Sequence, residues 1–328
     1  MNSEQLSATN YQLPITSSYS IFLALKRNYV PIMLNLLFEP LSFGFMRDAL
    51  VIAASLGILC SVVGSYLIVQ RQGILGDVIA HAVLPGIAIA LFLGIDIFLG
   101  AFVCGTFSTF VIAWIESQSR VKVDAAMALV FSGFLALGIM LISVLKSKVD
   151  LHHFLFGDIL GVTTEDVFRT LIITSVTLLL VKVCYKELLF YTFDPLGAQA
   201  SGLPTNIIKF GLTAAITLTI IASMQAVGVV LVISLLIGPG VTAYLLVNEL
   251  HQMMLLGSVI GIIGSVGGLY ISYYQNVPSG ASIVLFICGL FLLALLFSPS
   301  QGILTRPRAR KLNRSQKVLH EVAKVKRR

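Results

Sequence analysis

The sequence predicts an all-α, polytopic integral membrane protein, and its composition is the first reason. Of the 328 residues, 57% are hydrophobic and only 11% are charged, and the mean hydropathy is +0.95. A typical soluble domain carries about 25% charged residues, and a globule in water needs more polar surface than this chain supplies. The composition therefore excludes an ordinary cytosolic enzyme, a disordered protein and a nucleic-acid-binding domain, and it leaves a bundle of membrane-spanning helices.

The second reason is a series of long apolar runs separated by short polar segments. A membrane-spanning helix needs about 20 residues, with a range of about 17 to 25. Several runs are near the short end, and residues 206–247 contain almost no polar break, so we expect eight or nine helices. The runs cover residues 48–69, 78–94, 96–115, 124–145, 169–185, 206–224, 226–247, 254–274 and 281–298.

The N-terminal residues are expected to lie outside this bundle. Residues 1–27 are rich in Ser, Asn, Gln and Thr and show no signal-peptide pattern. Residues 28–47 are apolar but contain Pro31, Glu39 and Pro40, which favours a segment at the membrane interface. The expected organisation is an N-terminal extension (1–47), a transmembrane domain (48–301) and a basic tail (302–328).

Positive charge is concentrated at the C-terminus. Residues 306–328 contain ten Lys and Arg and one Glu, a net charge of +9, whereas residues 1–305 carry a net charge of −2. The positive-inside rule places such a tail in the cytoplasm, where it can contact anionic lipid. No aromatic residue is interleaved with the basic ones, so we expect no nucleic-acid partner.

The other basic residues orient the helices. Arg71, Arg120, Lys122 and the stretch 182–209 are expected to face the cytoplasm together with the tail. Alternating nine spans under this constraint places the loops 116–124, 186–205 and 248–253 inside and the loop 146–168 outside. In this scheme Lys146 and Lys148 lie on the outer side, against the rule.

Small side chains in the apolar runs are expected to serve helix packing. Gly257 and Gly261, and again Gly264 and Gly268, have the small-xxx-small spacing that lets helices approach closely in lipid. We expect this packing to lie within one subunit. None of the four cysteines forms a C-x-x-C pair, so neither a disulfide framework nor a zinc ribbon is indicated.

Asp77 and His81 are the leading candidates for a functional site. Ionisable side chains inside a membrane domain are costly and usually functional, and residues four apart share one face of a helix. A carboxylate oxygen with an imidazole nitrogen suits Mn²⁺, Fe²⁺ or Zn²⁺, while Gly73, Gly76 and the Pro85-Gly86 pair allow the broken helix typical of ion sites. The spacing equally allows an Asp–His pair whose members satisfy each other in a helix interface. Two residues are too few to hold a metal, but two copies in a homodimer would supply four ligands.

A second group of metal-compatible side chains lies in the predicted outer loop. It consists of Asp150, His152, His153 and Asp158. These residues could form a metal entry path, but a polar interfacial turn in which Gly157 redirects the chain is favoured. His251 lies beside Asn248 and Glu249 in a short predicted cytoplasmic loop and is expected at the surface.

The chain is not expected to be an enzyme. It contains no G-x4-G-K-[ST] phosphate loop and no Gly-Lys dipeptide, so ATP-driven transport would need a separate ATPase polypeptide. It also contains no H-E-x-x-H motif and no G-x-S-x-G elbow, so an intramembrane hydrolase has little support.

Several long motifs in a consistent order resemble the membrane subunit of the ABC-type manganese, zinc and iron importers, the ABC-3 permease family. The resemblance covers residues 48–301 and implies a fold similar to that of the cobalamin-type (type II) importers, with fewer helices. One departure is Gly238-Pro239-Gly240-Val241, where relatives often have Thr-Pro-Ala-Ala, and the extra glycines are expected to loosen that helix. The motifs are GDVIAHAVLPG at 76–86, FSGFLALGI at 131–139, DLHHFLFGDIL at 150–160, FDPLGAQASGL at 193–203 and QAVGVVLVISLLIGPGVTAYLL at 225–246.

The resemblance implies a multi-pass protein of the bacterial plasma membrane that works as a homodimer. Its expected partners are two ABC ATPase subunits and an extracellular or periplasmic metal-binding protein. In that family, the positions of Asp77 and His81 are associated with the metal pathway. The D-x3-A-x3-G pattern, here Asp194, Ala198 and Gly202, lies on the cytoplasmic side, and the segment 246–254, with Asn248, Glu249 and His251, is expected to be the coupling helix for the ATPase.

The cargo implied by the resemblance is Mn²⁺, with no permanently bound cofactor. The motifs at 131–139 and 150–160 look closer to manganese members than to zinc members. A mixed oxygen and nitrogen site binds Zn²⁺ more tightly than Mn²⁺, so selection must come from geometry or from the binding protein. The alternatives are a zinc or iron(II) importer, an ion-coupled secondary carrier and a structural scaffold. No convincing inverted repeat is found to support a carrier, and the Asp77–His81 pair argues against a scaffold.

Overall fold

Helices make up nearly all of the described chain, as the sequence predicts. The computed structural model describes residues 38–145 and 157–298, and no strand occurs among them. The chain divides into two units, residues 1–47 and 48–328. In the first unit, Pro40–Ser42 form the short helix η1, and Ser42 Oγ donates a hydrogen bond to the Glu39 carbonyl at 2.6 Å. The next helix begins at Gly44, still in the first unit, and the helices after it belong to the second unit.

Eight helices of the described chain are long and apolar enough to cross a membrane, and a bent pair brings the count to nine. This confirms the predicted eight or nine spans. The eight are α2 (Gly44–Val69), α3 (Leu75–Ala82) together with α4 (Leu84–Leu93), α5 (Ile97–Gln118), α6 (Val123–Val144), α11 (Thr205–Val227), α12 (Val229–Leu246), α13 (Leu250–Gln275) and α14 (Ser279–Phe297). The bent pair is α8 (Thr164–Val183) with α9 (Tyr185–Phe193), which meet at 70°.

The predicted loop 146–168 ends earlier than expected, and the predicted loop 186–205 is mostly helical. Helix α8 begins at Thr164 because Thr163 and Asp166 form a capping box, in which the Thr163 hydroxyl accepts from the Asp166 amide and the Asp166 carboxylate accepts from the Thr163 amide. Because the first turn of α8 is polar, the apolar pattern of the sequence does not indicate that the helix begins there. After α8, the segment 186–205 is mostly helical, in α9 and in α10 (Pro195–Ala200), instead of an open loop.

Three contacts join helix ends at one side of the bundle. Gln70 reaches Thr192, and the Lys209 ammonium lies 3.4 Å from the Glu116 carboxylate. A third hydrogen bond, from the Ser298 hydroxyl to the Leu245 carbonyl, joins the end of α14 to the end of α12. At the opposite side, the Arg169 guanidinium lies 3.7 Å from the Asp96 carboxylate and 4.2 Å from the centre of the Phe98 ring.

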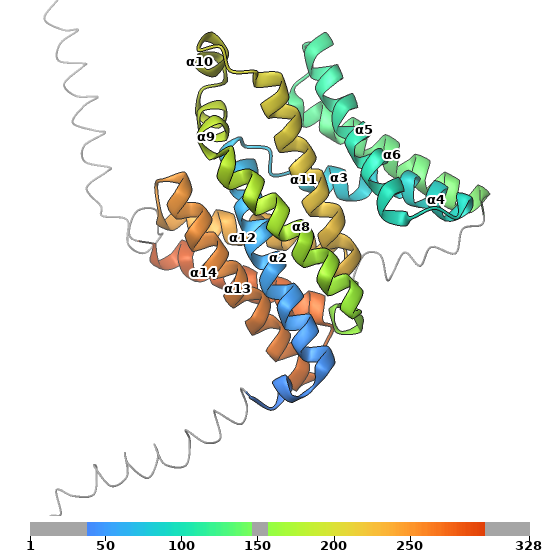
Figure 1. The fold of residues 1–328 in the computed structure, drawn as a ribbon, viewed down its shortest axis with the longest axis vertical. Helices are drawn as coiled ribbons and strands as arrows, with labels where there is room; N and C mark the ends of the chain where they lie inside the picture. The colour runs from blue at the N-terminus through green and yellow to red at the C-terminus, as the bar shows by residue number, and fades with distance from the viewer. Residues whose placement is uncertain (1–37, 146–156, 299–328) are drawn as a thin grey trace, which may run out of the picture. The chain divides into compact units, whose positions relative to one another are not determined.

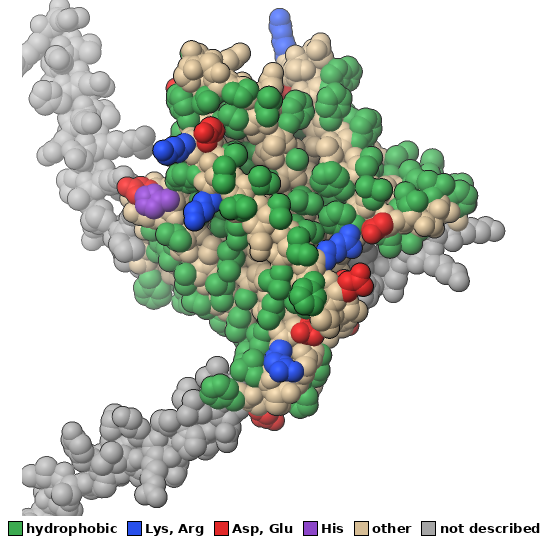
Figure 2. Space-filling view, in the orientation of Figure 1, with side chains coloured by type: hydrophobic (Ala, Val, Ile, Leu, Met, Phe, Trp, Pro, Cys, Tyr) green, Lys and Arg blue, Asp and Glu red, His purple; other side chains and the backbone are tan. Residues whose placement is uncertain are grey.

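The predicted orientation agrees with this arrangement. In Figure 1, α9 and α10 lie beside the beginning of α11, at the same end of the bundle as the end of α5. That end carries Arg120, Lys122, Lys186 and Lys209, so the positive-inside rule assigns it to the cytoplasm. Figure 2 shows hydrophobic side chains over most of the visible face between the charged ends, as expected for a surface that meets lipid.

Glycines allow the closest helix contacts, and these lie within one chain, as predicted. A Cβ atom added at Gly57 of α2 would lie 2.7 Å from the Gly261 backbone of α13. Gly264 and Gly268 of α13 likewise lie against Ile287 and Ile283 of α14. Such close approach provides the dispersion contacts that hold helices together where lipid removes the hydrophobic drive.

Helix α12 is not loosened by its extra glycines. It continues from Val229 to Leu246 with Pro239 inside it. A Cβ atom at Gly238 would lie 2.4 Å from a methyl carbon of Ile287, and one at Gly240 would lie 2.5 Å from the Cδ1 of Ile68. The two glycines therefore make room for neighbouring side chains, and the expectation of a looser helix is wrong.

Candidate functional site

Helix α3 is short because the chain on both sides of it resists helix formation. Before it, Arg71 adopts a left-handed backbone conformation, with φ at 59°. After it, the helix breaks at Val83, and Pro85 stands in the first turn of α4, where its missing N–H costs no hydrogen bond. The break predicted from Pro85 and its neighbouring glycine is thus observed.

Asp77 and His81 form the open face of an otherwise buried segment. All residues from 75 to 88 except these two are buried, while the side chains of Asp77 and His81 are 42% and 19% exposed. The rest of α3 packs against α5, α6, α11 and α12, so Asp77 and His81 lie on the part of the helix that these neighbours leave open. The structure therefore places both groups on one face, as the four-residue spacing predicts.

The geometry of the pair determines which imidazole nitrogen is free. His81 Nδ1 lies 3.3 Å from Asp77 Oδ1 and 3.0 Å from the Asp77 carbonyl oxygen. Two acceptors beside Nδ1 favour the tautomer that carries its proton there, which leaves the Nε2 lone pair free. A carboxylate that orients a histidine in this way is common beside metal ions. The Phe131 ring of α6 also meets the imidazole edge to face, with centroids 5.1 Å apart.

The described part of the chain supplies two ligand side chains at this place. Among residues 38–145 and 157–298, no group of three or more His, Cys, Asp and Glu side chains is arranged to hold a metal ion. A lone Asp–His pair leaves most of the coordination shell of a divalent ion open. The site is therefore incomplete within the described chain.

Of the predicted entry path, only Asp158 lies in the described chain. Asp158 is exposed, and its carboxylate caps the short helix η2 (Ile159–Gly161) by accepting from the Leu160 amide at 3.2 Å. Gly157 has a φ of 61° and lies against the backbone of Val227. These two residues form the turn that the sequence favoured, while Asp150, His152 and His153 lie outside the described residues.

The D-x3-A-x3-G pattern encodes one short helix and its two ends. The Asp194 carboxylate caps α10 by accepting from the Gly197 amide at 2.8 Å. Ala198 is buried, and Gly202 ends the turn with a φ of 85°, which only glycine adopts easily. The pattern thus produces an exposed helix at the end of the bundle that we assign to the cytoplasm.

The segment 246–254, predicted to be the coupling helix, forms no helix of its own, and its role toward the ATPase stays a prediction. Helix α12 ends at Leu246, three residues follow, and α13 begins at Leu250 and continues for 26 residues. Asn248 and Glu249 are exposed in the link. His251 is also exposed, as predicted, and its Nε2 lies 3.3 Å from the Glu249 carboxylate.

Sequence reasoning missed two polar contacts near these segments. Gln70 Nε2 donates to Thr192 Oγ1 at 3.3 Å, and Lys209 pairs with Glu116. The partners are separated by 122 and 93 residues, so no local pattern indicates either contact.

The sequence of this chain is similar to those of known membrane transport proteins. The sequence profile of the ABC 3 transport family matches residues 42–298. The chain is 42% identical over 264 residues to the "Manganese transport system membrane protein MntC" of Listeria innocua. The aligned residues make up 80% of this chain and 94% of that protein. It is 38% identical over 275 residues to the "Chelated iron transport system membrane protein YfeD" of Yersinia pestis, covering 84% and 93%.

A solved structure is similar in both sequence and fold. A chain of "PsaBC from Streptococcus pneumoniae in complex with Fab" superposes with a TM-score of 0.75 at 41% sequence identity. The match covers 82% of this chain and 97% of that chain. The residues matched by the family profile include Asp77, His81 and Asp194.

Proposed function

The chain belongs to the ABC 3 transport family, and from this premise we propose that it is the permease subunit of an ATP-driven importer of Mn²⁺. The shared motifs and the 42% identity to a protein named for manganese transport support this function. The observation that carries it is the open Asp77–His81 face on a buried, broken helix. Two ionisable groups at membrane depth are costly; Asp77 and His81 lie 3.3 Å apart and partly satisfy each other, and a passing cation at their open face would offset the rest of that cost.

Asp77 and His81 are proposed to contact the metal ion in passing. The carboxylate supplies a hard oxygen and Nε2 of the imidazole supplies a nitrogen, a donor set that suits Mn²⁺. An incomplete shell releases its ion more readily than a closed cage, which is what a transport pathway needs. A second copy of the chain would contribute another pair, so a homodimer would offer four ligands around its axis.

Transport is proposed to be driven from the cytoplasmic end by separate ATPase subunits. The sequence contains no nucleotide-binding motif, so hydrolysis must occur on a partner. The exposed helix α10 and the link around Asn248 lie at the end with the basic residues and are the proposed contacts for the ATPase. An external metal-binding protein would deliver Mn²⁺ to the opposite end.

Tracer uptake tests this function. Cells that express the chain with its ATPase and binding protein should accumulate radioactive Mn²⁺, and a catalytically dead ATPase should abolish accumulation. Continued accumulation with the dead ATPase would instead identify a secondary carrier. Asp77→Ala and His81→Ala should each abolish uptake at unchanged protein level, whereas Glu165→Gln, at an exposed carboxylate in the first turn of α8, should not. Normal uptake by both site variants would refute the assigned residues.

Iron(II) is the second candidate cargo. The similarity to a chelated-iron permease favours it, and the same oxygen and nitrogen donors also bind Fe²⁺. Competition by unlabelled ions distinguishes the two cargoes. If manganese is the cargo, unlabelled Mn²⁺ should suppress uptake of tracer Mn²⁺ at a lower concentration than unlabelled Fe²⁺ does. The reverse order would assign iron.

A further inference from the structure

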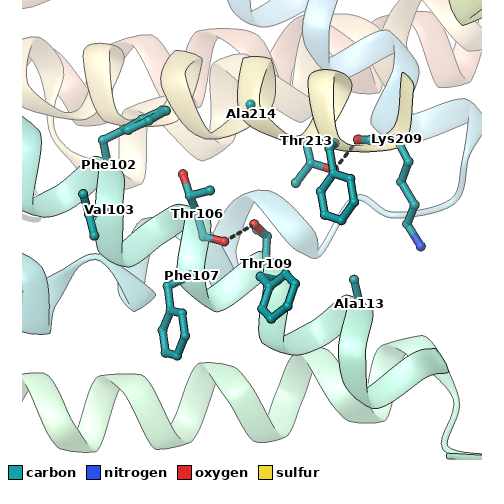
Figure 3. Close-up of a pocket in the computed structure, with 11 residues that line it drawn as sticks. Phe102, Val103, Thr106, Phe107, Thr109, Ala113, Lys209, Thr213 and Ala214 are labelled. Carbon is teal, nitrogen blue, oxygen red and sulfur yellow. Dashed lines mark hydrogen bonds between the residues drawn. The ribbon is translucent and has the colours of Figure 1, made fainter. Parts of the chain in front are cut away.

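A groove lies between α5 and α11, and one of its lining residues, Phe107, also contacts Phe134 of α6. It has a volume of about 440 Å³. Figure 3 shows its two walls, with Phe102 and Ala214 toward one end and Ala113 and Lys209 toward the other. The lining residues are Phe102, Val103, Thr106, Phe107, Thr109, Phe110, Ala113, Lys209, Phe210, Thr213 and Ala214.

The walls of the groove are mainly apolar but carry three threonine hydroxyls, of which the buried Thr106 Oγ1 has no hydrogen-bond partner within the described chain. Thr109 Oγ1 donates to the Thr106 carbonyl at 2.8 Å, and Thr213 Oγ1 donates to the Lys209 carbonyl at 2.9 Å. Both hydroxyls are thus satisfied by their own helix. Four large apolar residues of the lining remain more than half exposed, namely Val103, Phe107, Phe110 and Phe210.

One end of the groove carries a pair of opposite charges. Lys209 Nζ lies 3.4 Å from Glu116 Oε2, and both side chains keep about two fifths of their surface. Glu116 lies in the last turn of α5 and Lys209 in the first turns of α11. The pair therefore marks the cytoplasmic end, at the level where lipid headgroups begin.

The wall that α5 forms has the length of one leaflet of a bilayer, whereas the α11 wall, from Lys209 to Ala214, is about half as long. At a rise of 1.5 Å per residue, the stretch of α5 from Phe102 to Ala113 is about 16 Å long. The hydrocarbon core of a bilayer is about 30 Å thick, so one leaflet contributes about 15 Å. A groove that starts beneath the headgroup level and has one wall of this length fits a single acyl chain.

We propose that this groove binds one phospholipid of the cytoplasmic leaflet, with an acyl chain between α5 and α11 and a phosphoethanolamine headgroup on the Lys209–Glu116 pair. Basic pockets between membrane helices bind lipid phosphates on the cytoplasmic side. The adjacent carboxylate repels an anionic headgroup and attracts an ammonium group. A zwitterionic headgroup carries both charges and therefore complements both side chains.

Native mass spectrometry of the purified assembly tests the proposal. The assembly is taken from nanodiscs containing equal amounts of phosphatidylethanolamine and phosphatidylglycerol, and the lipid retained per copy is identified. The unaltered protein should retain phosphatidylethanolamine. Ala113→Trp and Ala214→Trp fill the groove and should each remove the retained lipid, whereas Leu285→Trp, at a residue of α14 that is 72% exposed, should leave it bound.

The charged pair provides a test that does not alter packing. Glu116→Gln removes the repulsion of anionic lipid and should shift retention toward phosphatidylglycerol roughly fivefold, the effect expected of one charge near the headgroups. Lys209→Gln should lower retention of both lipids. Three results would each overturn the proposal: retention unchanged by both groove-filling variants, no change of lipid preference in Glu116→Gln, or a cryo-EM map in which a second copy of the chain fills the groove.

Discussion

Gln70 donates a hydrogen bond to Thr192 across 3.3 Å and so joins the end of α2 to α9. Thr192 precedes the capping residue of α10 by two positions, and Gln70 begins the turn that leads to α3. Arg71 holds that turn in a left-handed conformation. One polar contact therefore connects the exposed α9–α10 segment with the turn that leads into α3, the helix that carries Asp77.

The first prediction concerns this contact. Thr192→Val and Gln70→Ala should lower the number of metal ions transported per ATP hydrolysed, because movement of α9 would no longer reach the turn before α3. A neutral hydrogen bond contributes about 0.5–1.5 kcal/mol, so a change of roughly two- to tenfold is expected. Parallel measurement of uptake and ATP hydrolysis in proteoliposomes gives the ratio.

The double variant provides the control for this contact. Gln70→Ala with Thr192→Val should behave like either single variant, because both changes remove the same interaction. Ser132→Ala removes a hydroxyl that bonds only within α6 and should leave the ratio unchanged. Additive losses in the double variant would mean that the two residues act separately.

The second prediction concerns helix packing. Gly261→Ala should destabilise the protein, because the new Cβ would lie 2.3 Å from the Gly57 carbonyl oxygen. Overpacking of this kind costs about 1–3 kcal/mol, which a fall in the thermal unfolding midpoint in detergent would show. Gly133→Ala is the matched control, since no atom lies within 4 Å of its added Cβ. There, alanine should stabilise α6 by about 0.5–1 kcal/mol, and equal midpoints for the two variants would contradict the packing seen here.

Local chemistry made much of this architecture predictable from the sequence. The apolar runs predicted the number of spans, and Pro85 predicted the break between α3 and α4. The spacing of Asp77 and His81 gave their common face. Each of these features depends on residues that are neighbours along the chain.

The features that were missed depend on contacts between distant segments or on weak polar signals. The start of α8 at Thr164 depends on a capping box in a polar turn. The tolerance of α12 for Gly238 and Gly240 depends on side chains from α14 and α2. The Lys209–Glu116 pair joins two helices that no sequence pattern places side by side. Such contacts require the packed structure.

The third prediction concerns the cap of α10. Asp194→Ala should weaken binding of the ATPase, because losing an N-terminal cap costs a helix about 1 kcal/mol and α10 has only six residues. Asp194→Asn and Asp194→Ser retain a capping oxygen and should restore binding. Pull-down of the ATPase with the detergent-solubilised permease measures this. Equal loss in Asp194→Asn would assign the role to the negative charge instead of the cap.

The last prediction concerns the choice between metals at α3. Nitrogen ligands favour Zn²⁺ over Mn²⁺, whereas carboxylates suit the harder Mn²⁺. His81→Glu replaces the nitrogen with an oxygen beside Asp77, so Zn²⁺ should become a weaker competitor of tracer Mn²⁺ uptake. Asp77→His makes the opposite change and should strengthen competition by Zn²⁺.

The competition midpoint, measured with a constant amount of binding protein, reports this effect separately from total activity. His251→Glu, at an exposed histidine outside α3, is the matched control and should leave the midpoint unchanged. Because delivery by the binding protein is the same in all variants, opposite shifts in His81→Glu and Asp77→His can arise only where the permease itself contacts the ion. If His81→Glu and Asp77→His both have the competition midpoint of the unaltered protein, the binding protein alone discriminates between the metals, and Asp77 and His81 have no part in that discrimination.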